Sequence, residues 1–130
     1  MARVSEKKVD EKLMRSVFNR LTDVIVRIGS HKSGRSFLYE FFGPAERTMI
    51  IKRFGIIVLL ARNVPWHLIE KKLGVSGSTT QRLAKRLDRG GYEFLAKIAK
   101  DPTIGSELAR IYKKILPPRG RGRWKWLYEI

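Results

Sequence analysis

One segment of the chain, residues 44–62, would be apolar around most of its circumference if it folds as a helix. Pro44 suits the first position of a helix and Glu46 its first turn, so the segment has a recognisable helix start. Nine large apolar side chains follow: Met49, Ile50, Ile51, Phe54, Ile56, Ile57, Val58, Leu59 and Leu60. A helix that is apolar on nearly every side must be buried on nearly every side. Because a chain of 130 residues has few other helices to cover it, the segment favours a core shared by two copies.

The other apolar residues also recur at helical spacing, and the predicted fold class is all-α. Between Ser5 and Ile28, apolar residues at positions 13, 17, 21, 24 and 28 match a period of 3.6 residues. Further helices are expected over residues 35–42, 65–73, 77–89, 92–100 and 106–115, and residues 29–34 are interpreted as a polar linker. The β-branched run at residues 56–58 could form a strand, but no neighbouring segment alternates in a way that would pair with it.

Composition shifts along the chain divide it into four predicted segments. Residues 1–43 are expected to be N-terminal dimerisation helices, and residues 44–91 a central helix followed by a DNA-binding region. Residues 92–116 are expected to be C-terminal helices. Residues 117–130 form a basic tail that alternates Arg with Gly and then becomes aromatic.

The net charge of the chain indicates what kind of partner it binds. The chain has 28 Lys and Arg against 12 Asp and Glu, a net charge of +16, so a polyanion is the expected partner and nucleic acid the first candidate. No apolar run approaches the roughly 18 residues of a membrane span, and the first residues lack the apolar core of a signal peptide. We therefore expect no membrane partner and a cytoplasmic, nucleoid-associated location.

The residue inventory argues against catalysis and bound metals. There is no cysteine, which removes disulfides, thiolate nucleophiles and Cys-ligated metal sites. The two histidines, His31 and His67, have no acidic companion at ligand spacing, so neither a metal nor a cofactor is expected. Paired carboxylates and a Gly-rich phosphate loop after a strand are also missing from the sequence, and the chain is predicted not to be an enzyme.

Residues 66–86 fit a helix-turn-helix in which Gly74 makes the turn. Four of the five positions that should point inward are apolar, and the fifth departs from the pattern: Ile69, Leu73, Val75, Leu83 and the exception Thr80. The outward face of the second helix is polar and basic, with Ser76, Gly77, Ser78, Thr79, Gln81, Arg82, Lys85 and Arg86. Gln81 can pair with adenine, while Arg82 or Arg86 can reach guanine or phosphate. Arg89 at the end of this helix is added to the candidate DNA contacts, and His67 early in the first helix is interpreted as a phosphate contact or a solvated side chain. An ordinary helical hairpin with a basic solvated face is the alternative.

Residues 38–89, about 40% of the chain, resemble the tryptophan repressor family. Phe42-Gly43-Pro44-Ala45-Glu46-Arg47 is similar to the Leu-Thr-Pro-x-Glu-Arg that opens the central helix of that family. The resemblance continues through Arg53 and the apolar stretch to residues 69–79 around the turn glycine. It implies an all-helical, intertwined homodimer in which the N-terminal helices of one chain pack on the other.

The same resemblance allows a position-by-position comparison with the corepressor pocket of the tryptophan-binding member of the family. Arg53 and Arg82 match the two arginines that flank the bound indole in the tryptophan-binding member. Gly43 stands at the position of a threonine, Leu83 at that of a space-giving glycine, and Arg86 at that of a serine. Since leucine would fill the pocket and an added guanidinium would repel the ammonium of the ligand, tryptophan is not expected as corepressor. Arg53 and Arg82 are interpreted as phosphate contacts or structural partners.

The tail carries a second candidate DNA contact. Pro118-Arg119-Gly120-Arg121 matches the core of an arm that lies in a narrow minor groove, although Gly122 departs from the motif. A flexible basic tail, in which Arg119, Arg121 and Arg123 meet phosphates, and contacts to single-stranded RNA are the alternatives. The aromatic residues after it are expected to pack on the dimer or on a partner surface.

Together these features predict a homodimeric, sequence-specific double-stranded-DNA-binding protein, a transcriptional repressor on a pseudo-palindromic operator. Two helix-turn-helix units would enter successive major grooves about 34 Å apart. Ser78, Thr79 and Gln81 would read bases, and the arginines and lysine that follow would mix base and phosphate contacts. A non-specific or architectural nucleic-acid-binding protein and the DNA-binding component of a recombination system are the alternatives.

Overall fold

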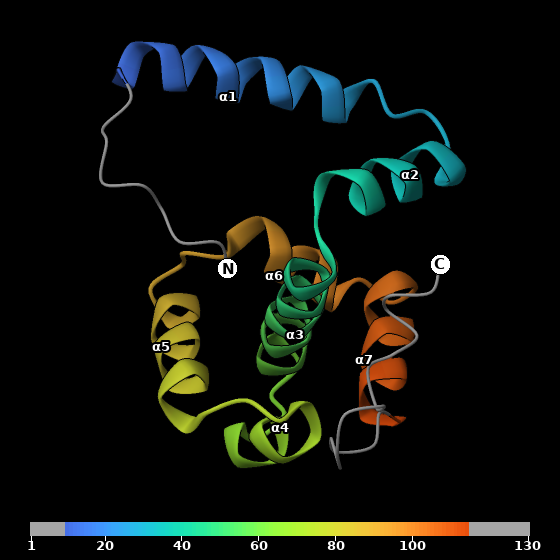
Figure 1. Ribbon diagram of the computed structural model, residues 1–130. Helices are drawn as coiled ribbons and strands as arrows, with labels where there is room; N and C mark the ends of the chain where they lie inside the picture. The colour runs from blue at the N-terminus through green and yellow to red at the C-terminus, as the bar shows by residue number, and fades with distance from the viewer. Residues whose placement is uncertain (1–9, 115–130) are drawn as a thin grey trace. The chain divides into compact units, whose positions relative to one another are not determined.

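The computed structural model describes residues 10–114, and over that range the only regular secondary structure is helical (Figure 1). The seven helices of this part of the chain are α1 (Glu11–Val26), α2 (His31–Phe41), α3 (Pro44–Ala61), α4 (Trp66–Leu73), α5 (Gly77–Asp88), α6 (Glu93–Lys100) and α7 (Ile104–Lys114). The expected all-α fold is confirmed, and the β-branched run at residues 56–58 lies in α3.

The chain divides into two compact units, and the boundary falls between Arg47 and Thr48 in the second turn of α3. The divisions predicted from the sequence at residues 43, 91 and 116 remain predictions. None of the helices among residues 10–114 is long and apolar enough to cross a membrane. The part of the predicted N-terminal helix before residue 10 and the predicted minor-groove arm lie outside the described residues.

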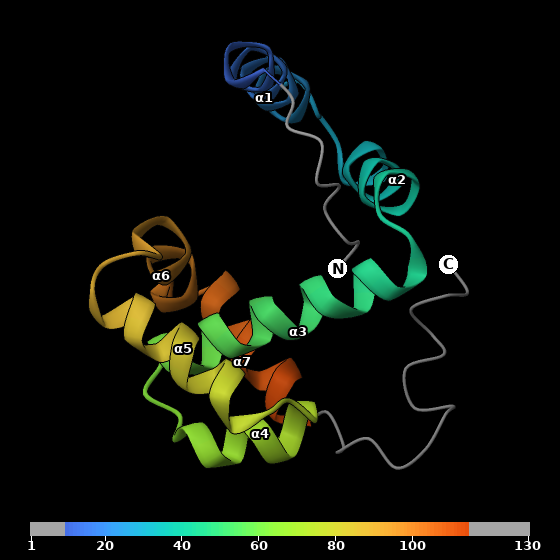
Figure 2. The ribbon, with the colours of Figure 1, turned by 60° about the vertical axis from the view of Figure 1, so that its left-hand side comes forward.

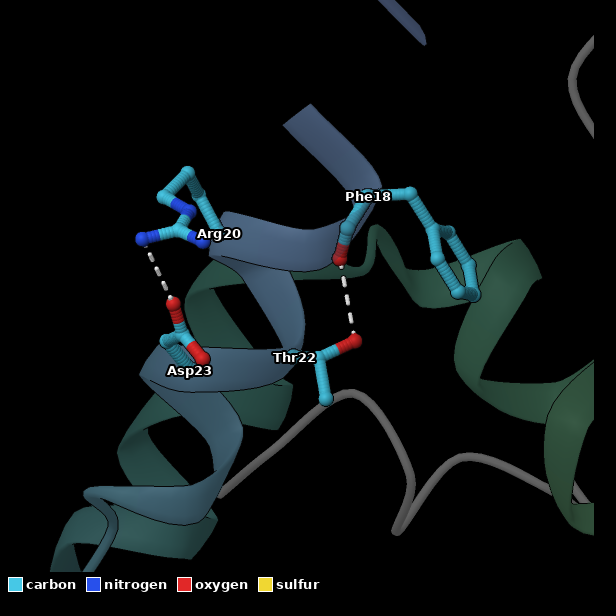
Figure 3. Close-up of polar contacts among 4 residues, drawn as sticks. All are labelled: Phe18, Arg20, Thr22 and Asp23. Atoms are coloured by element: carbon cyan, nitrogen blue, oxygen red, sulfur yellow. Dashed lines mark hydrogen bonds and ion pairs between the residues drawn. The ribbon is translucent and has the colours of Figure 1, made fainter. Parts of the chain in front are cut away.

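The helices of the first unit are held by local contacts. Asp10 caps α1 by accepting a hydrogen bond from the Lys12 amide, at 2.9 Å. Arg20 and Asp23 form an ion pair at 3.1 Å, and the Thr22 hydroxyl donates to the Phe18 carbonyl at 3.0 Å. Figure 3 shows the Phe18 ring pointing away from the ion pair, so α1 has a polar side and an apolar side. No residue of α1 or α2 is buried.

The prediction of a linker over residues 29–34 is wrong, because α2 begins inside it, at His31. Ser30 is the cap: its hydroxyl oxygen accepts a hydrogen bond from the Ser33 amide at 3.1 Å. Gly34 lies in the helix, where a Cβ atom would stand 3.4 Å from a methyl group of Ile28. The small, polar composition that suggests a linker belongs to a capped helix start and a close contact with the preceding loop.

The junction of α2 and α3 is closed by side chains of the first turn of α3. Glu46 accepts a hydrogen bond from the Gly43 amide at 3.1 Å, as an acidic side chain in the third position of a helix often does. Arg47 donates to the carbonyls of Tyr39 and Phe42, and its guanidinium carbon lies 4.0 Å from the centre of the Tyr39 ring. The Pro-x-Glu-Arg sequence therefore fixes how the chain enters α3.

In the second unit, α3 is the central element, with α5 on one side and α7 on the other (Figures 1 and 2). Its residues 55–59 are all buried. The core contains side chains from all five helices of the unit: Ile56, Val58, Leu59, Ala61, Ile69, Leu73, Leu83, Ala99, Ala109 and Tyr112. Residues 55–59 of the apolar segment are therefore covered by α4 to α7 of the same chain, whereas Met49 and Ile50 nearer its start are 40% and 39% exposed.

Two contacts lock α7 against α3. A Cβ atom at Gly55 would stand 2.4 Å from the ring of Tyr112, so only glycine lets the ring lie on the backbone of α3. The Tyr112 hydroxyl donates to the Ile51 carbonyl at 2.7 Å, and burial raises the pKa of this phenol well above its ordinary value.

The start of α7 also differs from the prediction, which placed it at Ser106. The helix begins at Ile104 because the Asp101 carboxylate accepts hydrogen bonds from the amides of Thr103 and Ile104, at 2.8 and 2.9 Å. Asp101 thus caps the start of α7, and the loop before this helix is shorter than predicted.

Candidate nucleic-acid interface

The turn between α4 and α5 depends on Gly74. This residue adopts left-handed backbone angles, φ 62° and ψ 43°, that a side chain disfavours. Its amide donates to the Glu70 carbonyl at 2.9 Å, and the Val75 amide donates to the same oxygen at 3.3 Å. The last turn of α4 is thereby closed, and the chain turns sharply into α5 as a helix-turn-helix requires.

The inward positions of the helix-turn-helix are filled nearly as predicted. Ile69 and Leu73 are completely buried, Leu83 is 6% exposed and Val75 is half-buried. Thr80, the departure from the apolar pattern, is also completely buried. Its hydroxyl donates to the Ser76 carbonyl one turn earlier, at 3.2 Å, so the polar atom is satisfied within its own helix and costs little to bury.

Three hydroxyl side chains gather at the start of α5. The Ser76 oxygen accepts a hydrogen bond from the Thr79 amide at 3.2 Å, which makes it the N-cap of the helix. The same hydroxyl donates to the Thr79 hydroxyl at 2.8 Å and lies 3.2 Å from that of Ser78. Ser76 and Ser78 are exposed and Thr79 is half-buried. Ser76 therefore has a structural role in capping as well as its predicted place on the outward face.

Glu70 and Gly77 form a contact that the sequence analysis missed. A Cβ atom at Gly77 would stand 2.6 Å from the Glu70 Oε1 atom, so the glycine lets this carboxylate lie directly against the start of α5. That oxygen is buried, and no described residue hydrogen-bonds to it. A carboxylate near the positive end of a helix is favourable. The glycine directly after a capping serine is the one signal of this contact in the sequence.

The cationic face of α5 contains two kinds of residue. Gln81, Arg82, Lys85 and Arg89 are exposed, and their side chains make no hydrogen bond, ion pair or ring contact with any described residue. The guanidinium of Arg86, by contrast, lies over the ring of Tyr92, 4.8 Å from its centre. A Cβ atom at Gly91 would stand 2.5 Å from the Arg86 Cγ atom, so this glycine gives the arginine side chain its space.

Tyr92 and Gly91 are thus the second pair that sequence reasoning missed. Gly90-Gly91 is visible in the sequence only as the end of a helix, because the stacking partner lies on the next element. Stacking on an aromatic ring restricts where a guanidinium can lie. Arg86 is therefore held in place, whereas Arg82, Lys85 and Arg89 extend from the helix.

The remaining predicted residues lie apart from this face or outside the description. His67 is exposed near the start of α4 with its ring edge-on to Trp66, 6.0 Å between centres. Arg53 is exposed on α3, and none of the described residues bonds to it. Leu83 lies in the core, so the position where the resemblance has a glycine is filled. Arg119, Arg121 and Arg123 lie outside the described residues. Within residues 10–114, no three His, Cys, Asp or Glu side chains lie close enough to hold a metal ion.

An all-α chain with this turn geometry and this outward face belongs to the class of helix-turn-helix DNA-binding proteins. The family model described as Trp repressor protein matches residues 16–101, which include most of α1 and all of α2 to α6, and the chain belongs to that family. Its members are DNA-binding transcriptional regulators and not enzymes, and they usually act as dimers. Comparison with curated proteins gives no match, and neither does comparison with solved structures.

Proposed function

We propose that the protein is a homodimeric, sequence-specific double-stranded-DNA-binding repressor that recognises a pseudo-palindromic operator. The observation that carries the proposal is the outward face of α5, where Gln81, Arg82 and Lys85 are exposed and their side chains make no hydrogen bond, ion pair or ring contact with any described residue. With a net charge of +16, a polyanion is the natural partner of this open cationic face. A polar, basic face on the second helix of a helix-turn-helix suits the major groove of DNA.

The first unit supports the dimer. It exposes a set of large apolar side chains, each between 49% and 68% exposed: Leu13, Met14, Val17, Phe18, Val24, Ile25, Leu38 and Phe41. Between the end of α1 and α2, a hollow of about 670 Å³ is lined by apolar groups that include Ile25, Ile28 and Phe37. Exposed apolar surface of this extent marks an interaction site. A second copy, which carries the same surfaces, is the occupant we propose.

We assign the residues on the outward face of α5 to different contacts according to their position along the helix. Ser78, Thr79 and Gln81 lie at its beginning, where a recognition helix meets base edges, and we assign them to base reading. Arg82, Lys85, Arg86 and Arg89 follow and would mix base and phosphate contacts. Ser76 and Gly77 would approach the DNA through the backbone at the positive end of the helix, and His67 would contact a phosphate.

Tryptophan is not proposed as a corepressor. Leu83 fills the position that must be empty for the indole, and it does so as a member of the core. Arg86 is stacked on Tyr92 and adds a positive charge at the edge of the same region. Arg53 and Arg82 therefore have no ligand in this proposal and are assigned to phosphate contacts.

Selection of binding sites from random duplexes tests the proposal, with the unmodified protein beside Gln81→Ala and Lys85→Ala. The wild type should select a sequence with two-fold symmetry. Gln81→Ala should lose about 1–3 kcal/mol of discrimination at one base position in each half-site, whereas Lys85→Ala should weaken all sequences alike. If no sequence is selected, and both variants weaken binding uniformly, the protein is a non-specific, architectural binder and the base-reading assignment is wrong.

A further inference from the structure

The second unit has an apolar crevice that the DNA-binding face does not use. It lies where the end of α3 and the loop after it meet α4 and the last turn of α7, and its volume is about 280 Å³. Its lining consists of Leu59, Val64, Leu68, Ile69, Lys72 and Lys113. The Lys72 ammonium donates to the Lys113 carbonyl, so α4 and α7 are tied together at its rim.

The chemistry of the crevice suits an aromatic side chain. Its four apolar side chains offer no partner for a polar group. A protein cavity of about 150 Å³ holds benzene, so this volume is ample for an indole. Lys72 and Lys113 add positive charge at the rim, and an ammonium group over an aromatic face is favourable, most of all for tryptophan. Leu68, which is 43% exposed, leaves the crevice open on the α4 side.

We propose that the crevice is the docking site of this chain's own C-terminal segment, residues 115–130, with Trp124 or Trp126 as the anchor. The segment starts directly after Lys114, one residue beyond a side chain that lines the crevice. Trp124 is the tenth residue after Lys114, an extended reach of up to about 33 Å, which is more than a return to the crevice needs. The segment contains two of the three tryptophans of the chain, the third being Trp66.

Docking would fix the arginines that precede the anchor. Arg119, Arg121 and Arg123 lie between Lys114 and Trp124, so an anchored tryptophan closes a basic loop whose two ends both lie at the crevice. Because Leu68, Ile69 and Lys72 belong to α4, this loop would stand beside the first helix of the helix-turn-helix. The docking itself does not depend on DNA binding and can be tested without DNA.

The test uses the full chain in a Trp66→Phe background with excitation selective for tryptophan, so that the emission comes from Trp124 and Trp126. We expect their emission to be blue-shifted, and their quenching by acrylamide reduced, relative to the same chain unfolded in urea. Leu68→Glu places a charge in the crevice and should bring both values to those of the unfolded chain. Ile104→Glu is the matched control: Ile104 is 53% exposed on α7 but does not line the crevice, and this change should leave both values unaltered.

A second measurement covers the case in which Leu68→Glu fails to fold, as judged by circular dichroism. Replacing Trp124 and Trp126 by serine leaves every core residue intact and should shift the methyl NMR signals of Leu68, which lose a ring current. Emission in the folded chain that equals that of the unfolded chain would overturn the proposal, as would unchanged Leu68 signals. Emission that turns blue only at concentrations where sedimentation shows association would make the tail of another copy the occupant, which also overturns it.

Discussion

The two units of the chain satisfy their apolar residues in opposite ways. In the second unit, side chains from α3 to α7 bury one another, and Ile56, Leu59, Ile69 and Leu73 are at most 1% exposed. In the first unit, α1 and α2 follow an equally regular helical pattern and bury nothing. Helical periodicity thus predicts an apolar face on each helix, but it does not show whether the same chain covers that face.

The largest expected effect comes from making the same truncation in both units. Leu73→Ala should lower the free energy of unfolding by about 2–5 kcal/mol, because it leaves a cavity in a closed core. Leu13→Ala, at a site 60% exposed, should change it by less than about 0.5 kcal/mol in dilute solution. Urea unfolding followed by circular dichroism measures both. Equal losses at low protein concentration would show that the first unit has a core of its own, and the contrast between the units would fail.

The next effect concerns the apolar side of α1. Phe18→Glu should weaken self-association by about 2 kcal/mol, or about thirtyfold in the dissociation constant, because an anchor of the proposed interface becomes charged. Sedimentation equilibrium measures this. Arg20→Gln makes the same change of charge on the other side of the helix, away from the Phe18 ring, and is the control (Figure 3). An equal effect of the two substitutions would point to net charge and not to the apolar face.

A smaller effect is expected inside the second unit at Tyr112. Tyr112→Phe should cost about 1 kcal/mol at neutral pH, since the hydroxyl loses its bond to the Ile51 carbonyl. Burial raises the pKa of this phenol in the folded chain above its unfolded value near 10, so the contribution is complete below about pH 10 and is lost as the pH rises further. The difference in unfolding free energy between the wild type and Tyr112→Phe should therefore shrink above pH 10. A difference that stays constant to pH 11 would contradict this account.

The smallest effect concerns the stack of Arg86 on Tyr92, and it presupposes DNA binding. Tyr92→Leu should weaken DNA binding by about 0.5–1 kcal/mol, because Arg86 loses the ring that orients it, while Tyr92→Phe keeps the ring and the affinity. The slope of affinity against salt should stay as in the wild type in Tyr92→Leu, since Arg86 retains its charge, and should fall by about 1 in Arg86→Ala. Adding Tyr92→Leu to Arg86→Ala should cost nothing more. Additive losses would show that Tyr92 acts independently of the arginine.

Much of the second unit could be predicted from the sequence, because its signals are local. Gly74 and the spacing of Ile69, Leu73 and Leu83 define the turn and the inward side of the helix-turn-helix within a few residues. Thr80 looked like a departure only because its partner, the Ser76 carbonyl, is a backbone atom that the sequence pattern does not show.

The features that the sequence did not predict depend on contacts between different helices and loops. The Arg86–Tyr92 stack joins α5 to the residue before α6, and the Glu70–Gly77 contact depends on the angle between α4 and α5. Neither follows from periodicity. The start of α2 was missed for a different reason: Ser30 stands between glycines and polar residues, and a cap in that setting has the composition of a loop.

The contact between Gly55 and the Tyr112 ring has a consequence for how this protein can vary. The ring rests on bare backbone, and Ile51 holds its hydroxyl four residues earlier on the same helix. A single methyl group at position 55 would push α7 outward and, with it, the wall of the crevice that Lys113 forms. If the C-terminal segment docks as proposed, its site depends on the hydrogen atom that position 55 carries in place of a side chain.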